Sequence, residues 1–339
     1  MAVIRKLPSA VVAVVSQIAA GEVIERPASA LKELLENSRD GAAKKIEIDI
    51  IEGGIRRLAV KDDGCGIGKE DLPLAVSPHA TSKIEALSDL DDLSTMGFRG
   101  EALASIAAVA SLTVRSRSAD DANGHELALR GEYGSEEPRP VPMACGTEVI
   151  VEDLFAQVPA RRKFLRRPPT EWAHCESVAS AFALSAPEID ITLSRDGKPR
   201  RRWRRASASE RVKSVYGPRF AEQAKSSEFS LGPLHAQVLI ATGLPAAGRN
   251  KVILNGRVLN DRLLRQAVRK GAADVSRESE PAYAIFLTLP AQFADVNAHP
   301  AKTEVRFREP QAIFKFVMDA VAAAVATPLG PPRRLVVTG

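Results

Sequence analysis

A helix pattern over residues 28–38 places a carboxylate and an amide one turn apart. Its apolar residues recur at helical spacing, and Pro27, just before them, is tolerated in a first helical turn. Glu33 and Asn37 are therefore expected on one helix face. A carboxylate can orient or deprotonate water, and an amide oxygen can bind Mg²⁺. The alternative is an amphipathic surface helix that holds both side chains in solvent.

A hairpin is predicted after this helix. Residues 45–51 alternate apolar and polar side chains as a half-buried strand does, and residues 57–61 form the expected partner strand after Gly53-Gly54. The second strand leads into Asp62 and then into glycines at positions 64, 66 and 68. Glycines at alternate positions let the backbone approach a ligand and adopt positive φ. Taken alone, this motif indicates a ligand site only weakly.

A long polar stretch and a glycine-flanked helix start come next. Residues 70–98 show no regular period, and a loop of this length in a compact domain is typical of a lid or a binding loop. The run Gly97-Phe98-Arg99-Gly100-Glu101 then opens an Ala-rich helix expected over 102–109. Free backbone N–H groups at such a start favour anions, phosphates included.

The remaining elements are expected in two groups. Strands are predicted at 112–116 and 147–151, and residues 197–205 as a turn with a basic extension. A second unit is expected from about residue 211, with strands at 236–242, 251–254 and 283–289, helices at 261–270 and 311–325, and then a Pro-containing tail. We find no internal repeat.

Composition narrows the class of protein. The chain has 339 residues, 45% of them hydrophobic, which is enough for about two domains, and no apolar run reaches the ~20 residues of a membrane helix. Residues 1–20 look like a secretory signal at first, but the apolar run is short and broken by Ser16 and Gln17. The three cysteines are far apart and lack CxxC spacing, which argues against a disulfide framework or a zinc site. We expect a cytoplasmic protein, associated with the nucleoid if bacterial.

The net charge of +5 conceals an asymmetry. Residues 1–150 carry 17 Lys and Arg against 24 Asp and Glu, whereas residues 151–339 carry 30 against 18. A basic second half is expected to attract a polyanion, most often nucleic acid. A charge excess that only aids solubility is the alternative.

No Gly-x-x-x-x-Gly-Lys-Ser/Thr motif is present, so the chain is not a P-loop protein. Other motifs occur in order along nearly the whole chain: IAAGEVIERP (18–27), KELLENS (32–38), DxGCGI (62–67), HATSK (79–83), GFRGEAL (97–103), PARRKFL (159–165) and VNAHPAK (296–302). Together they resemble the motifs of the MutL family of DNA mismatch repair proteins.

This resemblance implies an α+β chain with two domains. The first is a GHKL (Bergerat) ATP-binding α/β sandwich over 1–208 with a lid at about 70–100. The second is a smaller α/β domain like ribosomal protein S5 over 209–328, and residues 329–339 begin a linker. The C-terminal domain of family members would be missing, so we expect no nuclease activity and a monomer without nucleotide.

The resemblance also implies the site residues and the cofactors, ATP and Mg²⁺. Glu33 would be the general base that aligns water, Lys302 would reach the γ-phosphate, and Asn37 would hold Mg²⁺. Asp62 would accept a hydrogen bond from the adenine amino group, with support from Thr147. The further nucleotide contacts would be Asp40, Gly66, Thr81, Ser82, Lys83, Gly97, Phe98, Arg99, Gly100, Glu101, Ala102 and Leu103.

Three departures from the family pattern stand out. The family usually has Ala-Gly where this chain has Gly41-Ala42, which is expected to end the helix sooner. Asp63 replaces an Asn, and a negative charge there is expected to repel phosphate. Residues 155–158 lack the usual Tyr-Asn before Pro-Ala-Arg.

DNA is the expected macromolecular partner. Cations cluster at 161–163, 166–167, 200–205 and 257–270. Without a zinc finger or basic zipper, we expect contact with the DNA backbone and no sequence reading. The candidate residues are Arg161, Arg162, Lys163, Arg257, Arg262, Arg265 and Arg269. A solvated basic face is the alternative, above all for 200–205, which fits an exposed hairpin.

The resemblance implies further partners and a switch. These are the mismatch-recognition protein MutS, a downstream helicase and nuclease, and a second copy of the chain that joins when ATP orders the lid. Slow hydrolysis is expected, because reopening would limit turnover. The rival hypotheses are a recruitment scaffold with vestigial turnover, and a histidine kinase or topoisomerase subunit. The kinase needs an upstream phosphoacceptor His, and no His precedes His79.

Overall fold

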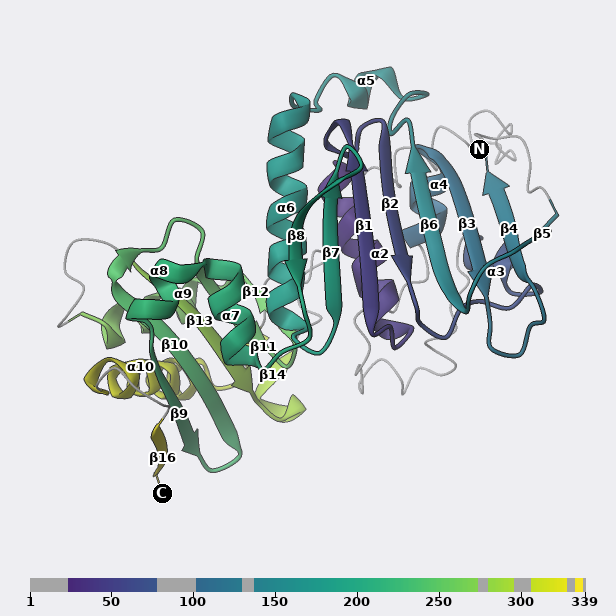
Figure 1. Cartoon of the computed structure of the whole chain (residues 1–339). Helices are drawn as coiled ribbons and strands as arrows, with labels where there is room; N and C mark the ends of the chain where they lie inside the picture. Colours follow the sequence, from purple (N-terminus) through teal and green to yellow (C-terminus); the bar gives the residue numbers. More distant parts are fainter. Residues whose placement is uncertain are drawn as a thin grey trace, which may run out of the picture. The chain divides into compact units, whose positions relative to one another are not determined.

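The computed structural model describes residues 24–77, 102–129, 137–273, 280–295, 306–327 and 333–337. The chain divides into two compact units (Figure 1). The first comprises residues 1–180 and 188–204, and the second comprises residues 181–187 and 205–339. Among the described residues, no helix is long and apolar enough to cross a membrane.

The first unit is built on an eight-stranded sheet. Its strand order is β5-β4-β3-β6-β2-β1-β7-β8; β1 and β7 pair in parallel, and the other neighbouring strands pair antiparallel. The strands are β1 (Lys45–Ile51), β2 (Arg57–Asp62), β3 (Ser111–Arg117), β4 (Gly124–Leu129), β5 (Arg139–Val141), β6 (Gly146–Glu152), β7 (Asp190–Arg195) and β8 (Lys198–Trp203).

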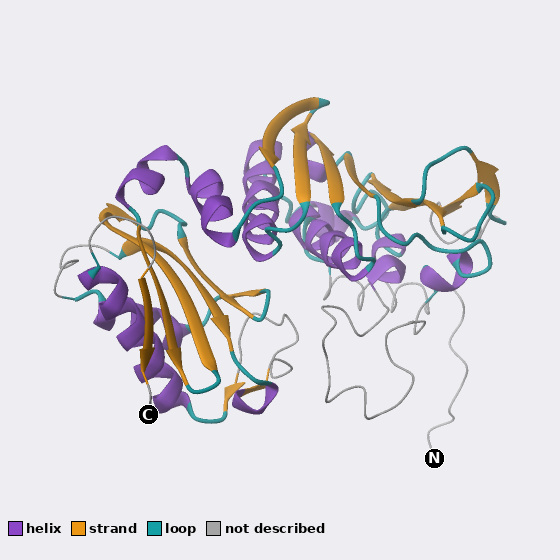
Figure 2. Cartoon of the chain, turned by 60° about the horizontal axis from the view of Figure 1, so that its bottom comes forward, coloured by secondary structure: helices purple, strands orange, loops and turns teal. Residues whose placement is uncertain are grey.

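Helices cover one face of this sheet (Figure 2). Helix α2 packs against β2 and α4, and α4 packs against β3. The sequence of β1 explains why one face is covered and the other is not. Ile46, Ile48 and Ile50 are buried on one face, while the alternate residues Lys45, Glu47 and Asp49 are not buried. The helical elements are α2 (Pro27–Asp40), η1 (Glu52–Gly54), α3 (Leu72–Ala75), α4 (Ala102–Ala107), α5 (Pro159–Arg162) and α6 (Pro168–Ser185).

The opposite face of the sheet carries a row of alternating charges. Lys61 is in register with Glu148, Glu148 with Arg115, and Arg115 with Glu126. Arg115 Nε lies 2.6 Å from Glu126 Oε2, and Arg115 Nη1 lies 3.2 Å from Glu148 Oε2. Opposite charges on directly paired residues favour this register, and they suit a face that stays in water.

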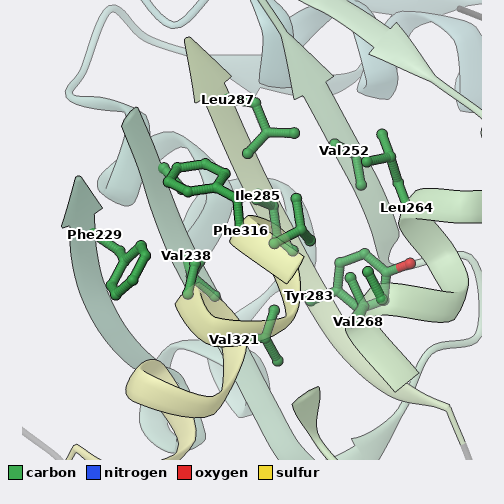
Figure 3. Packing of buried hydrophobic residues seen from close by; sticks show 14 of the residues in the cluster. Phe229, Val238, Val252, Leu264, Val268, Tyr283, Ile285, Leu287, Phe316 and Val321 are labelled. Carbon is green, nitrogen blue, oxygen red and sulfur yellow. The ribbon is translucent and has the colours of Figure 1, made fainter. Parts of the chain in front are cut away.

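The second unit has a six-stranded sheet of order β12-β11-β13-β10-β9-β16. Its core lies between this sheet and helices α9 and α10, where Phe229 and Phe316 meet at a centroid distance of 5.6 Å (Figure 3). The elements are α7 (Ala208–Tyr216), α8 (Pro218–Gln223), β9 (Lys225–Leu231), β10 (Leu234–Pro245), β11 (Asn250–Leu254), β12 (Arg257–Leu259), α9 (Arg262–Gly271), β13 (Pro281–Thr288), η3 (Ala291–Phe293), β14 (Ala294–Asp295), β15 (Arg306–Phe307), α10 (Pro310–Ala326) and β16 (Arg333–Val337).

Two predicted segments take a different form. Residues 198–203, predicted as the basic extension of a turn, form the edge strand β8, and β7 and β8 make the exposed hairpin named as the alternative. Cationic side chains suit an edge strand because they oppose pairing with other chains. Residues 333–337, predicted within a tail, pair in parallel with β9 as β16.

Candidate nucleotide-binding site

Helix α2 carries the two residues expected to act on water and metal. It runs from Pro27 to Asp40 and buries Leu31, Leu34 and Leu35, which confirms the predicted helix. Glu33 and Asn37 are one turn apart and half-buried, so neither is a fully exposed surface residue. Asp40 is the last residue of the helix and is also half-buried.

Asp62 ends β2, and hydrogen-bond donors hold its carboxylate. Ser38 Oγ donates to Asp62 Oδ2 at 2.7 Å, and the Gly64 N–H donates to Asp62 Oδ1 at 2.9 Å. Burial raises the pKa of the Asp62 carboxyl above its usual value, and hydrogen bonds to Ser38, Gly64 and Thr147 act in the opposite direction. The carboxylate is thus oriented on two sides at the end of a strand.

Thr147 is brought to Asp62 by the pairing of β2 with β6, in which the two residues are directly opposed. Its hydroxyl lies 2.9 Å from Ser116 Oγ, which also accepts the Ile67 N–H at 2.7 Å and donates to Gly146 O at 3.0 Å. Ser116 is fully buried and ties the glycine loop after β2 to β3 and β6.

The glycine loop requires glycine at two positions. Gly66 has φ +73°, and a Cβ there would lie 2.0 Å from Arg117 O. A Cβ on Gly64 would lie 2.5 Å from Gly41 O, which accepts the Cys65 N–H at 2.9 Å. The backbone after β2 therefore packs directly on the end of α2, so the glycines have a steric role whether or not a ligand is bound.

Asp63 has a structural contact that the sequence did not indicate. Its Oδ1 accepts the backbone N–H groups of Lys44 and Lys45, both at 2.7 Å. The carboxylate thereby fixes the start of β1 to the end of β2. An asparagine side-chain oxygen can accept the same two bonds, which gives a structural reason for either residue at this position.

Several expected nucleotide contacts lie outside the described residues. These are Thr81, Ser82, Lys83, Gly97, Phe98, Arg99, Gly100, Glu101 and Lys302. Ala102 and Leu103 are described: they begin α4, which packs against α2, and Leu103 is buried.

Two residues of the site were not predicted from the sequence, Ser38 and Ser116. Ser38 follows Asn37 in the KELLENS motif, so the motif itself held a signal for it. Ser116 lies in a predicted strand with nothing in the local sequence to mark it, because its role comes from the pairing of β3 with β6.

The expected DNA contacts lie on both units. In the first unit, Arg162 and Lys163 are exposed at the end of α5, Arg161 is half-buried, and the next residue, Phe164, is 81% exposed. In the second unit, Arg262, Arg265 and Arg269 are exposed on α9, and Arg257 is half-buried on β12. Arg265 Nη2 donates to Asn260 Oδ1 at 2.5 Å, and its Nε lies 3.9 Å from Glu280 Oε1.

Comparison with known proteins defines the class. Residues 24–138 match the family described as "Histidine kinase-, DNA gyrase B-, and HSP90-like ATPase", and residues 212–326 match "DNA mismatch repair protein, C-terminal domain". The MutL ATPase domain of Aquifex aeolicus complexed with ADP has a TM-score of 0.64 at 26% identity, covering 87% of this chain and 98% of that one. The B-subunit of DNA gyrase from Myxococcus xanthus shares the fold, with a TM-score of 0.57 at 13% identity. That match covers 93% of this chain and 96% of the gyrase chain. The first unit therefore has the GHKL ATPase fold, followed by an S5-like domain.

Sequence relatives give the family. A DNA mismatch repair protein MutL from Ralstonia nicotianae is 44% identical over 333 residues, which is 96% of this chain and 51% of that protein. A MutL from Thiobacillus denitrificans is 42% identical over 322 residues, which is 94% of this chain and 54% of that protein. The chain belongs to the MutL family of DNA mismatch repair proteins, in its ATPase region. It spans about half the length of these relatives.

Proposed function

We propose that this chain binds ATP with Mg²⁺ and hydrolyses it slowly as a switch in DNA mismatch repair. The observation that carries the proposal is the position of Asp62: the carboxylate is fixed at a strand end by Ser38 and Gly64, and Ser38 lies on the helix that carries Glu33 and Asn37. One structural unit thus holds an oriented acceptor for a base and a carboxylate–amide pair for phosphate chemistry.

In this proposal each residue of the candidate site has a distinct role. Asp62 accepts a hydrogen bond from the adenine amino group, and the Thr147 hydroxyl, held by Ser116, supports it. Glu33 orients and deprotonates the attacking water. Thr81, Ser82, Lys83 and residues 97–103 surround the phosphates, and Lys302 contacts the γ-phosphate.

The donor chemistry of the described site fits Mg²⁺. Among the residues that the structure describes, no group of three or more His, Cys, Asp or Glu side chains could hold a metal ion. Mg²⁺ in nucleotide sites is bound by one or two protein oxygens, and substrate phosphates and waters supply the rest. Asn37 would provide that oxygen, and the ion would neutralise phosphate charge.

Nucleotide state would be coupled to assembly. ATP would order residues of about 70–100 and create a surface for a second copy of the chain, since ordering on γ-phosphate contact is a known way to make a binding surface. A mismatch-recognition protein of the MutS type, a helicase and a nuclease are the proposed repair partners. The named relatives, DNA mismatch repair proteins, support this context.

DNA would be bound through its backbone. Arg161, Arg162 and Lys163 form one cationic surface at α5, and Arg262, Arg265 and Arg269 form another on α9, near Arg257 on β12. Phe164 adds an exposed ring beside the first surface. We expect DNA binding to weaken steeply as the salt concentration rises and to change little with base sequence.

Single substitutions on α2 and β2 test the proposal. Glu33→Ala is expected to bind ATP but to lower kcat by about 10²- to 10⁴-fold, because it removes the general base. Asn37→Ala and Asp62→Ala are expected to lose ATP binding in a calorimetric titration. Glu36→Ala is the matched control on the same helix. Glu36 Oε1 lies 3.8 Å from Lys32 Nζ, and we assign Glu36 no role in hydrolysis. Unchanged turnover in Glu33→Ala would contradict the assignment.

A further inference from the structure

Two exposed cysteines lie together at the ends of β2 and β6. Cys145 Sγ lies 3.5 Å from Gly64 O and 3.9 Å from Cys65 O. Cys65 Sγ in turn lies 3.5 Å from Gly66 O. The third cysteine, Cys175, is fully buried. The chain therefore contains one pair of neighbouring accessible thiols and one inaccessible thiol.

The backbone holds the two segments against each other. Gly146, directly after Cys145, packs so tightly on β2 that a Cβ on it would lie 2.1 Å from Asp62 O. The next residue, Thr147, pairs with Asp62. Cys65 is three residues beyond Asp62, so both cysteines extend from the same paired strand ends.

The sulfur of Cys145 lies next to the backbone of Cys65. A carbonyl oxygen lies about 2.4 Å from its own Cα, so Cys145 Sγ is within about 6.3 Å of the Cys65 Cα. A disulfide joins Cα atoms that are about 4.4–6.8 Å apart, so the two segments must bring their Cα atoms within this range and the Cys65 side chain must turn toward Cys145. Cys65 stands between Gly64 and Gly66, and glycines on both sides let its backbone make the remaining adjustment.

We propose that Cys65 and Cys145 form a reversible disulfide when the protein meets hydrogen peroxide. One thiolate attacks a peroxide oxygen and becomes a sulfenic acid, and the departing hydroxide takes a proton and leaves as water. The second thiol attacks the sulfenic sulfur, the S–S bond forms, and a second water leaves. Two thiols and one peroxide thus give one disulfide and two waters, and thiol–disulfide exchange with a dithiol restores both thiols.

The position of the disulfide gives it a consequence, which rests on the proposed function. It would pull the loop after Asp62 toward β6 and break the bond from the Gly64 N–H to Asp62 Oδ1. Asp62 would then lose one of the donors that orient it. Nucleotide affinity should fall by about tenfold, the factor expected for losing one hydrogen bond to a charged group.

Thiol mapping on the full 339-residue chain tests the cross-link itself. After peroxide treatment, non-reducing peptide mapping should show a Cys65–Cys145 disulfide, and Cys175 should remain a thiol, since burial raises its pKa to about 12. Dithiothreitol should reverse the change. Separate sulfinic acids on the two exposed cysteines, or disulfides between chains, would overturn the proposal.

Variants separate the cross-link from its consequence. Cys145→Ser should form no intramolecular disulfide and keep its ADP affinity after peroxide, whereas Cys175→Ala, the matched control, should still cross-link and lose affinity. A cross-linked protein with unchanged ADP affinity would refute the consequence and leave the modification site standing. If the reduced protein failed to bind ADP, the proposed function would fail, and the peptide map would still decide the cross-link.

Discussion

Ser38 Oγ donates a 2.7 Å hydrogen bond to Asp62 Oδ2 across 24 residues of sequence. Ser38 is buried on α2, and Asp62 ends β2. The bond therefore fixes the helix that carries Glu33 and Asn37 to the strand that carries Asp62, the proposed acceptor for the adenine base. A site built from two elements has its geometry set at this contact.

Removing this donor tests how far the site depends on it. Ser38→Ala should lower the free energy of unfolding by about 1–2 kcal/mol, because a buried carboxylate oxygen loses a partner. ATP affinity should fall with it, as Asp62 is less firmly oriented. Denaturant unfolding and calorimetric titration measure the two effects. Ser185→Ala, which removes a buried hydroxyl bonded to Phe182 O in the second unit, should lower stability and leave ATP affinity unchanged.

The raised pKa of Asp62 predicts a pH dependence of stability. Because the folded pKa lies above the unfolded value, the folded state binds this proton more readily, and the charged carboxylate costs stability above the folded pKa. Asp62→Asn should therefore be more stable than the wild type at pH 7. That advantage should shrink as pH falls through the folded pKa, which denaturation at a series of pH values can follow. An advantage that stays constant or grows toward low pH would contradict the assigned cause.

Local patterns predicted the elements that carry the site. The apolar spacing around Leu31 and Leu34 predicted α2, and the alternation in 45–51 with Gly53-Gly54 predicted the β1–β2 hairpin; both are confirmed. Each of these signals lies within one element or one turn, where sequence spacing and spatial arrangement are directly related.

Contacts between distant strands could not be predicted in this way. The position of Ser116 depends on the pairing of β3 with β6, and the bonds from Lys44 and Lys45 to Asp63 depend on the packing of β1 on β2. The cationic run that forms β8 has no alternation, so the sequence left a turn extension and an exposed hairpin open, and the pairing with β7 decides for the hairpin. No period in the sequence carries this information.

The exchange of Gly41 and Ala42 relative to the family pattern has a measurable cost. The glycine was expected to end the helix sooner, and the helix does end at Asp40, directly before Gly41. Ala42 adopts φ 57°, while Gly41 has φ −74°. A left-handed Ala costs about 1–2 kcal/mol, and a glycine loses more entropy on folding. Ala42→Gly should therefore raise the free energy of unfolding by about 0.5–1 kcal/mol.

Gly41→Ala provides the comparison for this prediction. Its φ is ordinary, and the nearest atom to an added Cβ is Asn37 O at 3.4 Å, so the change should be small. Urea unfolding of the two single variants and the double variant measures both. A destabilised Ala42→Gly would show that the left-handed alanine carries no strain.

The exposed ring of Phe164 predicts a separate contribution to DNA binding. It is 81% exposed and directly follows Arg161, Arg162 and Lys163, so a ring and cations are available to one strand. Stacking of a base on an aromatic side chain contributes about 1–3 kcal/mol. Phe164→Ala should weaken binding of a single-stranded oligonucleotide by that amount without changing the salt dependence of the affinity.

Arg162→Ala should have the complementary effect on the same oligonucleotide. Loss of one phosphate contact should reduce the slope of log affinity against log salt by about 0.7. Fluorescence anisotropy at several KCl concentrations measures both variants. Leu74→Ala is the control, because Leu74 is also an exposed large apolar side chain, at 57%, and lies on α3. Equal losses in the Leu74 and Phe164 variants would mean that stacking on Phe164 contributes nothing, and an unchanged slope in Arg162→Ala would place that arginine outside the DNA contact.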